Sequence, residues 1–333
     1  MPALNNFYKK IGDEKIECIL CRHYCKLKNN QIGVCGVNQN KDGKLLNLVY
    51  GKVSAINVDP IEKKPLYHFL PGSSALSIGT VGCNFKCPFC QNWQISQTNN
   101  TNNSHTLTAS QIVDLAIKYN SKTIAYTYNE PTIFYPFAKD VALLAKEKGI
   151  KNIFVSNGFE SPEVIDDMIG VIDAFNIDIK GFNSSYYKKV LKGGLDGVLD
   201  TLKRLKERGF WVECTTLIVP NDNDSDEELE NIANFIATEL DINTPWHISA
   251  FHPDYKVTNK KSTPIKTLQK AYEIGKSKGL NYIYMGNVAL PSNTICPKCN
   301  STLIRRVGYN ITENNIIDGK CKFCQENIAG VWK

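Results

Sequence analysis

The chain has 333 residues, of which 42% are hydrophobic and 22% charged, with a formal net charge of +6 at pH 7. These proportions are ordinary for a folded domain and exclude a disordered or fibrous protein, and the length suits one main domain with appendages. No apolar run approaches the ~20 residues that span a bilayer, and the segment from Met1 to Lys10 lacks the apolar core of a signal peptide. We therefore expect a cytoplasmic protein without a membrane segment.

Cysteine is the most informative residue type in this chain. In a reducing compartment, the 12 cysteines are expected to bind metals rather than to form disulfides. All except Cys214 fall into three blocks, and Cys214, within an apolar run, is expected to be a small core residue. The blocks divide the chain into three predicted domains: residues 1–70, 71–290 and 291–333.

The first block reads Cys18-x2-Cys21-x3-Cys25-x9-Cys35. Four thiolates can close a zinc site, and zinc is the favoured interpretation of this N-terminal module. Four cysteines also serve an iron–sulfur cubane that relays electrons, and this alternative stays open. The spacing also leaves open that cysteine pairs are shared between the two ends of the chain.

The second block reads Cys83-x3-Cys87-x2-Cys90, three thiolates on a short loop. Three thiolates leave one iron of a [4Fe–4S] cluster without a protein ligand, where a small molecule can bind. Phe89 offers an aromatic ring that can pack against a purine. The preceding residues 75–82 are apolar and β-rich, so the loop is expected at a strand end, where α/β folds place their sites. The alternatives are a three-thiol zinc site with a distant fourth ligand, or surface thiols.

Strand-like and helix-like patterns alternate through the middle of the chain. The predicted strands are residues 75–81, 123–128, 152–156, 174–179, 210–219, 246–251 and 282–286. The predicted helices lie near residues 108–119, 134–148, 161–169, 195–208, 225–240 and 264–278. This alternation predicts βαβ units and a parallel sheet, in an α/β fold of the partial (β/α)6 barrel type. Thr108 is expected to cap the first helix, and Ser225 with Glu228 to form a capping box at the fifth.

Polar residues stand where the apolar runs stop. They are Asn129, Glu130, Ser156, Asn157, Asp178 and Lys180, with His247 in the sixth predicted strand. Because the carboxyl ends of barrel strands carry the chemistry, we expect these groups to converge above the three thiolates. Together they suit a zwitterionic, sugar-bearing ligand. A structural Asp178–Lys180 ion pair and a hydrogen-bonded core His247 remain the alternatives.

The third block consists of two knuckles, Cys296-x2-Cys299 and Cys321-x2-Cys324, separated by 21 residues. This spacing is typical of a zinc ribbon, in which four thiolates close the coordination sphere and hold together a module with little core of its own. Rubredoxin-like iron is the alternative. Four-thiolate zinc sites carry negative charge, so metal binding would reduce the positive charge of the chain ends. The net charge therefore does not indicate a nucleic-acid partner.

The loop from Cys83 to Cys90 resembles the radical S-adenosylmethionine (SAM) superfamily. The resemblance implies that SAM chelates the open iron, and that the reduced cluster splits SAM into methionine and a 5′-deoxyadenosyl radical that abstracts hydrogen. The middle of the chain is similar to the activases of glycyl-radical enzymes, such as pyruvate formate-lyase activating enzyme. The matching positions are Asn129-Glu130-Pro131, Ser156-Asn157-Gly158, Asp178-x-Lys180 and Pro245-Trp-His247. Val155 departs from that family, which has an aspartate there that helps to hold a monovalent cation.

Over nearly its whole length, the chain looks most like the AmmeMemoRadiSam-system radical SAM enzymes. The residues that carry this resemblance are the cysteine blocks, Asp59-Pro-Ile-Glu-Lys-Lys-Pro-Leu66, His68-Phe-Leu-Pro-Gly72 and Cys90-Gln-Asn-Trp93. It implies an electron donor such as a ferredoxin or flavodoxin, and hydrogen abstraction from a protein or a substrate delivered by a partner, AmmeMemoRadiSam-system proteins included. A function of another class is a zinc-ribbon adaptor or nucleic-acid-binding protein in which the barrel is a scaffold.

Overall fold

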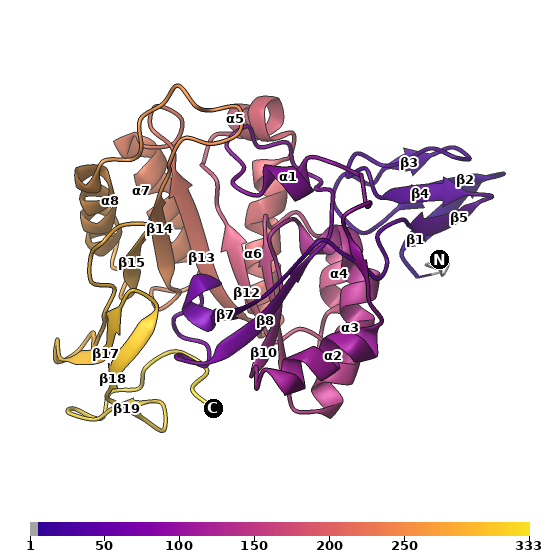
Figure 1. The fold of residues 1–333 in the computed structure, drawn as a ribbon. Coiled ribbons are helices and arrows are strands. Elements are labelled where there is room, and N and C mark those ends of the chain that lie inside the picture. The colour runs from indigo at the N-terminus through magenta and orange to yellow at the C-terminus, as the bar shows by residue number, and fades with distance from the viewer. Residues whose placement is uncertain (1–5) are drawn as a thin grey trace.

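The computed structural model describes residues 6–333, and an eight-stranded sheet lies at its centre (Figure 1). Residues 1–5, the start of the segment expected to lack a signal peptide, lie outside the described residues. The strands are β7 (Ala55–Pro60), β8 (Ser74–Gly79), β10 (Thr123–Tyr126), β11 (Lys151–Ser156), β12 (Ala174–Asp178), β13 (Trp211–Ile218), β14 (Trp246–Ala250) and β15 (Ile283–Gly286).

Neighbouring strands in this sheet follow the order of the chain. The spatial order is β15-β14-β13-β12-β11-β10-β8-β7. The strands from β8 to β15 are parallel, whereas β7 pairs antiparallel with β8 at the edge. The mixed α/β fold with a central parallel sheet is therefore confirmed, and each predicted strand is present. Sequence analysis did not foresee β7, which joins the sheet although it belongs to the first predicted domain.

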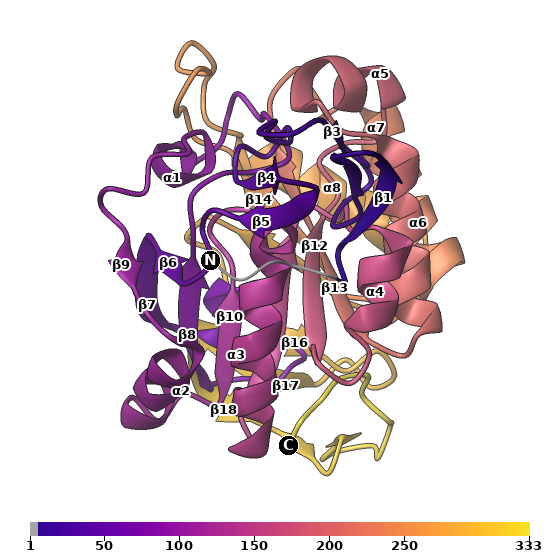
Figure 2. The same ribbon diagram turned by 90° about the vertical axis from the view of Figure 1, so that its right-hand side faces the viewer.

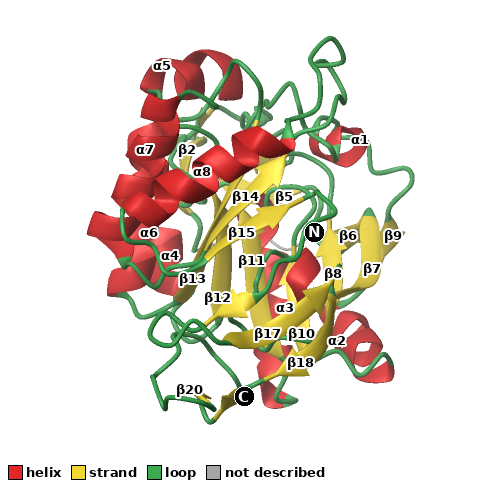
Figure 3. Cartoon of the chain, turned by 90° about the vertical axis from the view of Figure 1, so that its left-hand side faces the viewer, coloured by secondary structure: helices red, strands yellow, loops and turns green. Residues whose placement is uncertain are grey.

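Helices connect the parallel strands and match the six predicted helices. They are α2 (Ala109–Lys118), α3 (Tyr135–Glu147), α4 (Pro162–Asp167), α6 (Leu195–Glu207), α7 (Asp226–Phe235) and α8 (Ile265–Ser277). Figures 1 and 3 show them on the outer side of the sheet. Each long helix buries an apolar stripe against the strands; α2 buries Ile112, Val113 and Ala116.

The helix caps show how local sequence sets these boundaries. The Thr108 hydroxyl accepts a hydrogen bond from the Gln111 N–H (3.2 Å), and the Gln111 side chain accepts one from the Thr108 N–H (2.9 Å), so this cap is confirmed. Ser225 caps α7 through the Glu228 N–H (3.2 Å). The predicted box there is only half formed, because the Glu228 carboxylate accepts the N–H of Phe182 instead. Glu228 thereby ties the loop after β12 to α7.

The two faces of the sheet have different neighbours. Tyr126, Phe154 and Phe175 lie side by side on adjacent strands, with ring centroids 5.4 and 5.7 Å apart, and they belong to the main core under the helices. The residue before each of them faces the opposite side, as strand alternation requires. On that side, Ala125 and its neighbours pack against Ile61, Leu66 and Phe69. Residues 61–70 thus fill part of the inner face of the sheet.

Two cysteine-bearing modules lie at opposite ends of the strands (Figures 1 and 2). The N-terminal module contains β1 (Tyr8–Gly12), β2 (Lys15–Cys18), β3 (Lys26–Leu27), β4 (Asn38–Lys41) and β5 (Lys44–Asn47), and the C-terminal module contains β16 (Thr294–Ile295), β17 (Thr302–Val307), β18 (Asn310–Asn314), β19 (Ile316–Ile317) and β20 (Lys320–Cys321). A further small pair joins β6 (Lys52–Val53) to β9 (His105–Thr106). The predicted domain boundaries at residues 70 and 290 stay predictions.

A buried arginine anchors the C-terminal module to the rest of the chain. The Arg306 guanidinium lies over the Tyr67 ring, 4.2 Å from its centroid, and donates to the Tyr67 carbonyl (2.9 Å). Around this contact, Tyr282, Tyr284 and Leu303 form a small core separate from the main one. Among the helices of residues 6–333, none is both long and apolar enough to cross a bilayer.

Candidate active site

The loop with Cys83, Cys87 and Cys90 leaves the carboxyl end of β8 and reaches the short helix α1 (Trp93–Ser96). Its path requires close backbone contact, because a Cβ on Gly79 would lie 2.7 Å from the Thr127 carbonyl oxygen. Glycine therefore lets the ends of β8 and β10 meet beneath the loop. The three thiols and Phe89 line a cavity of about 490 Å³.

All eight residues predicted to bind a cofactor line this same cavity. They are Phe89, Asn129, Glu130, Ser156, Asn157, Asp178, Lys180 and His247. They come from the ends of successive parallel strands and from the cysteine loop, as expected if the strand ends share one face. Their convergence is a structural fact, whereas their roles in ligand binding stay predictions.

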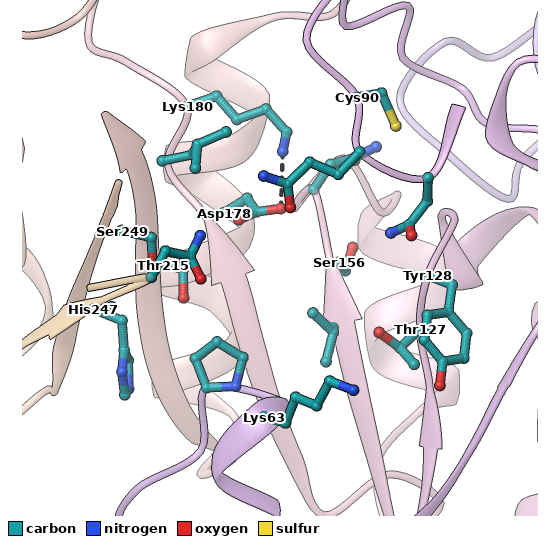
Figure 4. Close-up of a pocket in the computed structure, with 18 of the residues that line it drawn as sticks. Lys63, Cys90, Thr127, Tyr128, Ser156, Asp178, Lys180, Thr215, His247 and Ser249 are labelled. Carbon is teal, nitrogen blue, oxygen red and sulfur yellow. Dashed lines mark hydrogen bonds and ion pairs between the residues drawn. The ribbon is translucent and has the colours of Figure 1, made fainter. Parts of the chain in front are cut away.

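Lys180 and Asp178 stand beside the cysteine loop at the upper end of the cavity (Figure 4). The Lys180 Nζ lies 2.8 Å from the Asp178 Oδ2. Burial opposes the ammonium form, but the charges of Asp178 and Cys87 outweigh it and raise the pKa of Lys180. Burial raises the pKa of Cys87 to about 11, although the positive charge of Lys180 partly opposes this rise. Lys180 therefore supplies a fixed positive charge next to the thiols.

Glu130 holds the ends of two strands together. Its carboxylate accepts hydrogen bonds from the Ser156 hydroxyl (2.9 Å) and from the N–H groups of Asn157 (2.8 Å) and Thr132 (3.0 Å). Burial and the neighbouring Glu160 raise the pKa of Glu130 to about 7, and burial also raises the pKa of Glu160. Both buried carboxyl groups lie within hydrogen-bonding distance of the Ser156 hydroxyl, so they titrate as an interacting pair.

The two amides at the strand ends position the cysteine loop. The Asn129 Nδ2 donates to the Gly82 carbonyl (2.9 Å) and to the Thr80 hydroxyl (3.1 Å). The Asn157 Nδ2 donates to the Asn84 Oδ1 (2.7 Å) and lies 3.9 Å from the Cys83 sulfur. The two side chains thus hold the loop on either side of Cys83, Asn129 through the Gly82 backbone and Asn157 through the Asn84 side chain.

His247 lies at the far end of the cavity from Cys90, on the same side as Lys63 (Figure 4). Its Nε2 is 2.7 Å from the Glu213 Oε2, and both side chains are almost completely buried. Burial alone would raise the pKa of Glu213, but the hydrogen bond and charge of His247 lower it below its usual range. Glu213 also accepts the N–H groups of Tyr67 (2.9 Å) and His68 (2.8 Å). His247 therefore belongs to a buried polar network that reaches into the cavity.

Sequence analysis did not single out Glu213, Tyr128 or the hydroxyl groups of threonine and serine side chains that line the cavity. Glu213 gave a readable signal, since it is the one acidic residue in the apolar run 210–219. Tyr128 gave none: it has a left-handed backbone (φ 71°), and its hydroxyl donates to Asp59 (3.0 Å). A non-glycine residue at positive φ is often held there by a functional site. Val155 also lines the cavity, and its apolar side chain offers no oxygen to a cation.

The C-terminal thiols form a group suited to one metal ion. The sulfur atoms of Cys296, Cys299, Cys321 and Cys324 all lie within 4.8 Å of one another. The Cys296–Cys324 and Cys299–Cys321 separations are 3.6 and 3.7 Å. A tetrahedron of thiolates around zinc has edges of about 3.8 Å, so this donor set fits zinc in size and chemistry.

The N-terminal thiols have a different arrangement. Cys18, Cys21 and Cys35 are buried and Cys25 is half-buried. Burial raises the pKa of Cys18 to about 12, and the nearby Cys35 and Cys25 add smaller contributions. Among residues 6–333, the C-terminal set is the only group of three or more such ligands whose atoms all lie within 4.8 Å of one another, so the N-terminal set is more widely spaced.

The parallel sheet and the three-thiol loop at its strand ends define an α/β protein with a thiol-lined cavity where its parallel strands end. Residues 77–236, which contain this loop, match the radical SAM superfamily. An uncharacterized protein of Methanocaldococcus jannaschii is 43% identical over 97% of both chains. The pyruvate formate-lyase-activating enzyme of Clostridium pasteurianum is 26% identical over 46% of this chain and 66% of its own.

A solved structure agrees with the fold. A radical SAM methyltransferase from Sphaerobacter thermophilus superposes with a TM-score of 0.52 at 15% identity, over 65% of this chain and 67% of its own. The chain belongs to the radical SAM superfamily, and it is an enzyme of that superfamily. The narrower resemblance to the AmmeMemoRadiSam-system enzymes stays a prediction.

Proposed function

We propose that the protein cleaves SAM reductively and uses the resulting radical to abstract hydrogen from a protein or from a substrate delivered by a partner. The observation that carries this proposal is the cavity in which three thiols, a protonated lysine and the predicted ligand groups converge. When bound, a [4Fe–4S] cluster and SAM supply the 5′-deoxyadenosyl radical. Cys83, Cys87 and Cys90 would hold the cluster.

The residues of the chain divide the binding of SAM between them. Lys180 would offer its charge to the SAM carboxylate, and Asn157, whose amide lies 3.9 Å from the Cys83 sulfur, and Ser156 would bind the other polar groups of its amino acid part. Phe89 is buried in the cavity wall and can pack against the adenine. Asn129 and Glu130 would act indirectly, because their hydrogen bonds hold the cysteine loop and the strand ends in place.

His247 is better suited to the substrate than to SAM. It lies at the other end of the cavity from Cys90, the end at which Lys63 also lies (Figure 4). Tyr309 of the C-terminal module also lines the cavity. The C-terminal module thus contributes to the wall of the cavity in addition to its four-thiol group.

The nature of the substrate follows from similarity rather than from geometry. The similarity to a protein named as an activating enzyme favours a protein substrate. A small molecule is the second candidate, favoured by the polar groups Lys63, His247 and Ser249 in the cavity. The order of the strands, which follows the order of the chain, supports a partial (β/α)6 barrel. For the electron donor we propose a ferredoxin or flavodoxin in the cytoplasm.

The test is a cleavage assay on protein purified without oxygen. With dithionite and SAM, we expect 5′-deoxyadenosine from the wild type and from Cys214→Ala, which changes a core cysteine outside the three blocks. Added candidate partner proteins are expected to acquire a radical detectable by electron paramagnetic resonance (EPR). Absence of 5′-deoxyadenosine from an iron-replete wild type would reject the proposal, and cleavage coupled to a small metabolite alone would select the second candidate.

A further inference from the structure

The N-terminal cysteines lie near one another, since burial and, to a smaller extent, the charges of Cys18, Cys35 and Cys25 raise the pKa of Cys21. The Cys18 N–H donates to the Cys25 carbonyl (3.0 Å), which brings the end of β2 next to the beginning of β3. Gly33 lies against Cys25, since a Cβ on it would be 3.4 Å from the Cys25 sulfur. The Asn38 amide lies 3.5 Å from the Cys35 sulfur and can donate to it. All four thiols are free.

The separation of these thiols discriminates between metals. A single zinc ion draws four sulfur atoms to about 3.8 Å from one another, and the C-terminal set has this spacing. In residues 6–333, no three of the N-terminal sulfurs lie mutually within 4.8 Å. A [4Fe–4S] cubane binds each thiolate at a different iron corner, so its sulfur ligands stand about 6 Å apart. Spread thiols, three of them buried and one half-buried, therefore suit a cubane better than one ion.

The N-terminal cysteine set contacts the loop that carries Cys83. His23, between Cys21 and Cys25, has its Nε2 2.9 Å from the Asn84 carbonyl oxygen, to which it can only donate. A second contact lies on the other side of Cys83, at Gly82, because a Cβ on Gly82 would be 2.8 Å from the Cys35 carbonyl oxygen. Gly82 has φ of +91°, so this approach depends on glycine.

The two cysteine sets adjoin one hydrophobic core. Cys18, Cys35 and Cys87 belong to the same hydrophobic core, and Cys25, Cys83 and Cys90 pack against it. On the outer side, the half-buried Cys25 adjoins a loop whose Val34 is 50% exposed. The N-terminal set therefore stands between solvent and the three-thiol loop.

We propose that Cys18, Cys21, Cys25 and Cys35 ligate a second, fully coordinated [4Fe–4S] cluster that relays electrons to the SAM site. A low-potential one-electron carrier is oxidised by one electron and reduces this cluster. The same electron then reduces the cluster on Cys83, Cys87 and Cys90, and no bond forms or breaks in either step. The relay rests on the proposed function, whereas the presence of the cluster does not.

The first experiment measures metal in the triple variant Cys83→Ala/Cys87→Ala/Cys90→Ala, reconstituted without oxygen. We expect about four irons and about one zinc per chain in this variant, against about eight irons and one zinc in the wild type. Two zinc ions and no iron in the variant would overturn the proposal. If the variant does not fold, the wild-type iron content decides in the same way, since about four irons with two zinc ions would also overturn it.

The second experiment compares EPR spectra after reduction with dithionite. The triple variant should show a cluster signal that SAM does not alter, because four thiolates leave no open iron. In the wild type, two reduced clusters in contacting loops should broaden each other's signals, and a spectrum equal to the sum of two isolated clusters would refute the relay. Wild type that cleaves SAM with only one cluster would reject this inference and leave the proposed function intact.

Discussion

The two four-cysteine modules have the same number of thiols but different relations to the rest of the molecule. The C-terminal thiols lie within 4.8 Å of one another, in a module that shares a small core with Tyr67, Tyr282 and Tyr284. The N-terminal thiols are spread and pack on the main core beside the three-thiol loop. We therefore propose different roles for equal numbers of thiols: a metal site that stabilises the C-terminal module, and an electron-relaying cluster in the N-terminal one.

The largest expected effect separates the radical site from both modules. Cys87→Ala should lower SAM cleavage by at least ~1000-fold, because loss of one of three ligands removes the cluster. The main core should persist, since the loop lies at the strand ends, so the melting temperature should change little. Cys214→Ala is the control and should retain cleavage. Full activity in Cys87→Ala, measured as 5′-deoxyadenosine released, would contradict the assignment.

Cys321→Ser should produce the opposite pattern. Loss of one thiolate weakens zinc binding, and the C-terminal module should lose roughly 3 kcal/mol or more of stability. Protein that remains folded should still cleave SAM. Elemental analysis and thermal melts test this, with Phe323→Ser as the control, because Phe323 is 56% exposed in the same knuckle. If Cys321→Ser melted like the wild type but no longer cleaved SAM, the C-terminal thiols would serve catalysis rather than stability, and the prediction would be wrong.

Lys180→Met sharpens the comparison within the cavity. Removing the charge beside Cys87 should weaken SAM binding ~10–100-fold, since a charge-assisted hydrogen bond contributes about 1.5–3 kcal/mol. Iron content should stay the same. Equilibrium binding of SAM to the variant measures this, and Lys188→Met, at an exposed position, should bind normally. An unchanged affinity would favour a purely structural Asp178–Lys180 pair.

Glu130→Gln should have the smallest effect, seen as a change in pH dependence. The pKa of Glu130 is raised from 4.5 to about 7 in the folded protein, so its contribution to stability is complete below pH 4.5 and is lost as the pH rises through 7. The variant should lack this loss, which is on the order of 1 kcal/mol because Glu160 titrates with it. Denaturant unfolding at several pH values checks this, with exposed Glu147→Gln as control. If the free energy of unfolding depended on pH equally in the wild type and the variant, this prediction would be contradicted.

Hydrophobic period and turn signals were sufficient to predict the strands and helices of the main sheet, because each lies in a βαβ unit with local signals. The cavity residues were also predictable, since parallel strands bring their carboxyl ends together. Contacts between distant segments were not, as with β7 against β8 and Glu228 with Phe182. Nor could spacing along the chain give the separation of the N-terminal sulfurs, which depends on how β2, β3 and the loop before Cys35 pack.

The most direct test of the account is the EPR spectrum of the dithionite-reduced wild type before and after addition of SAM. The account predicts that part of the signal shifts when SAM binds the open iron of the cluster on Cys83, Cys87 and Cys90, and that the triple alanine variant shows no shift. An iron-replete wild type whose spectrum is unchanged at saturating SAM would contradict the central claim that this cavity is a SAM site.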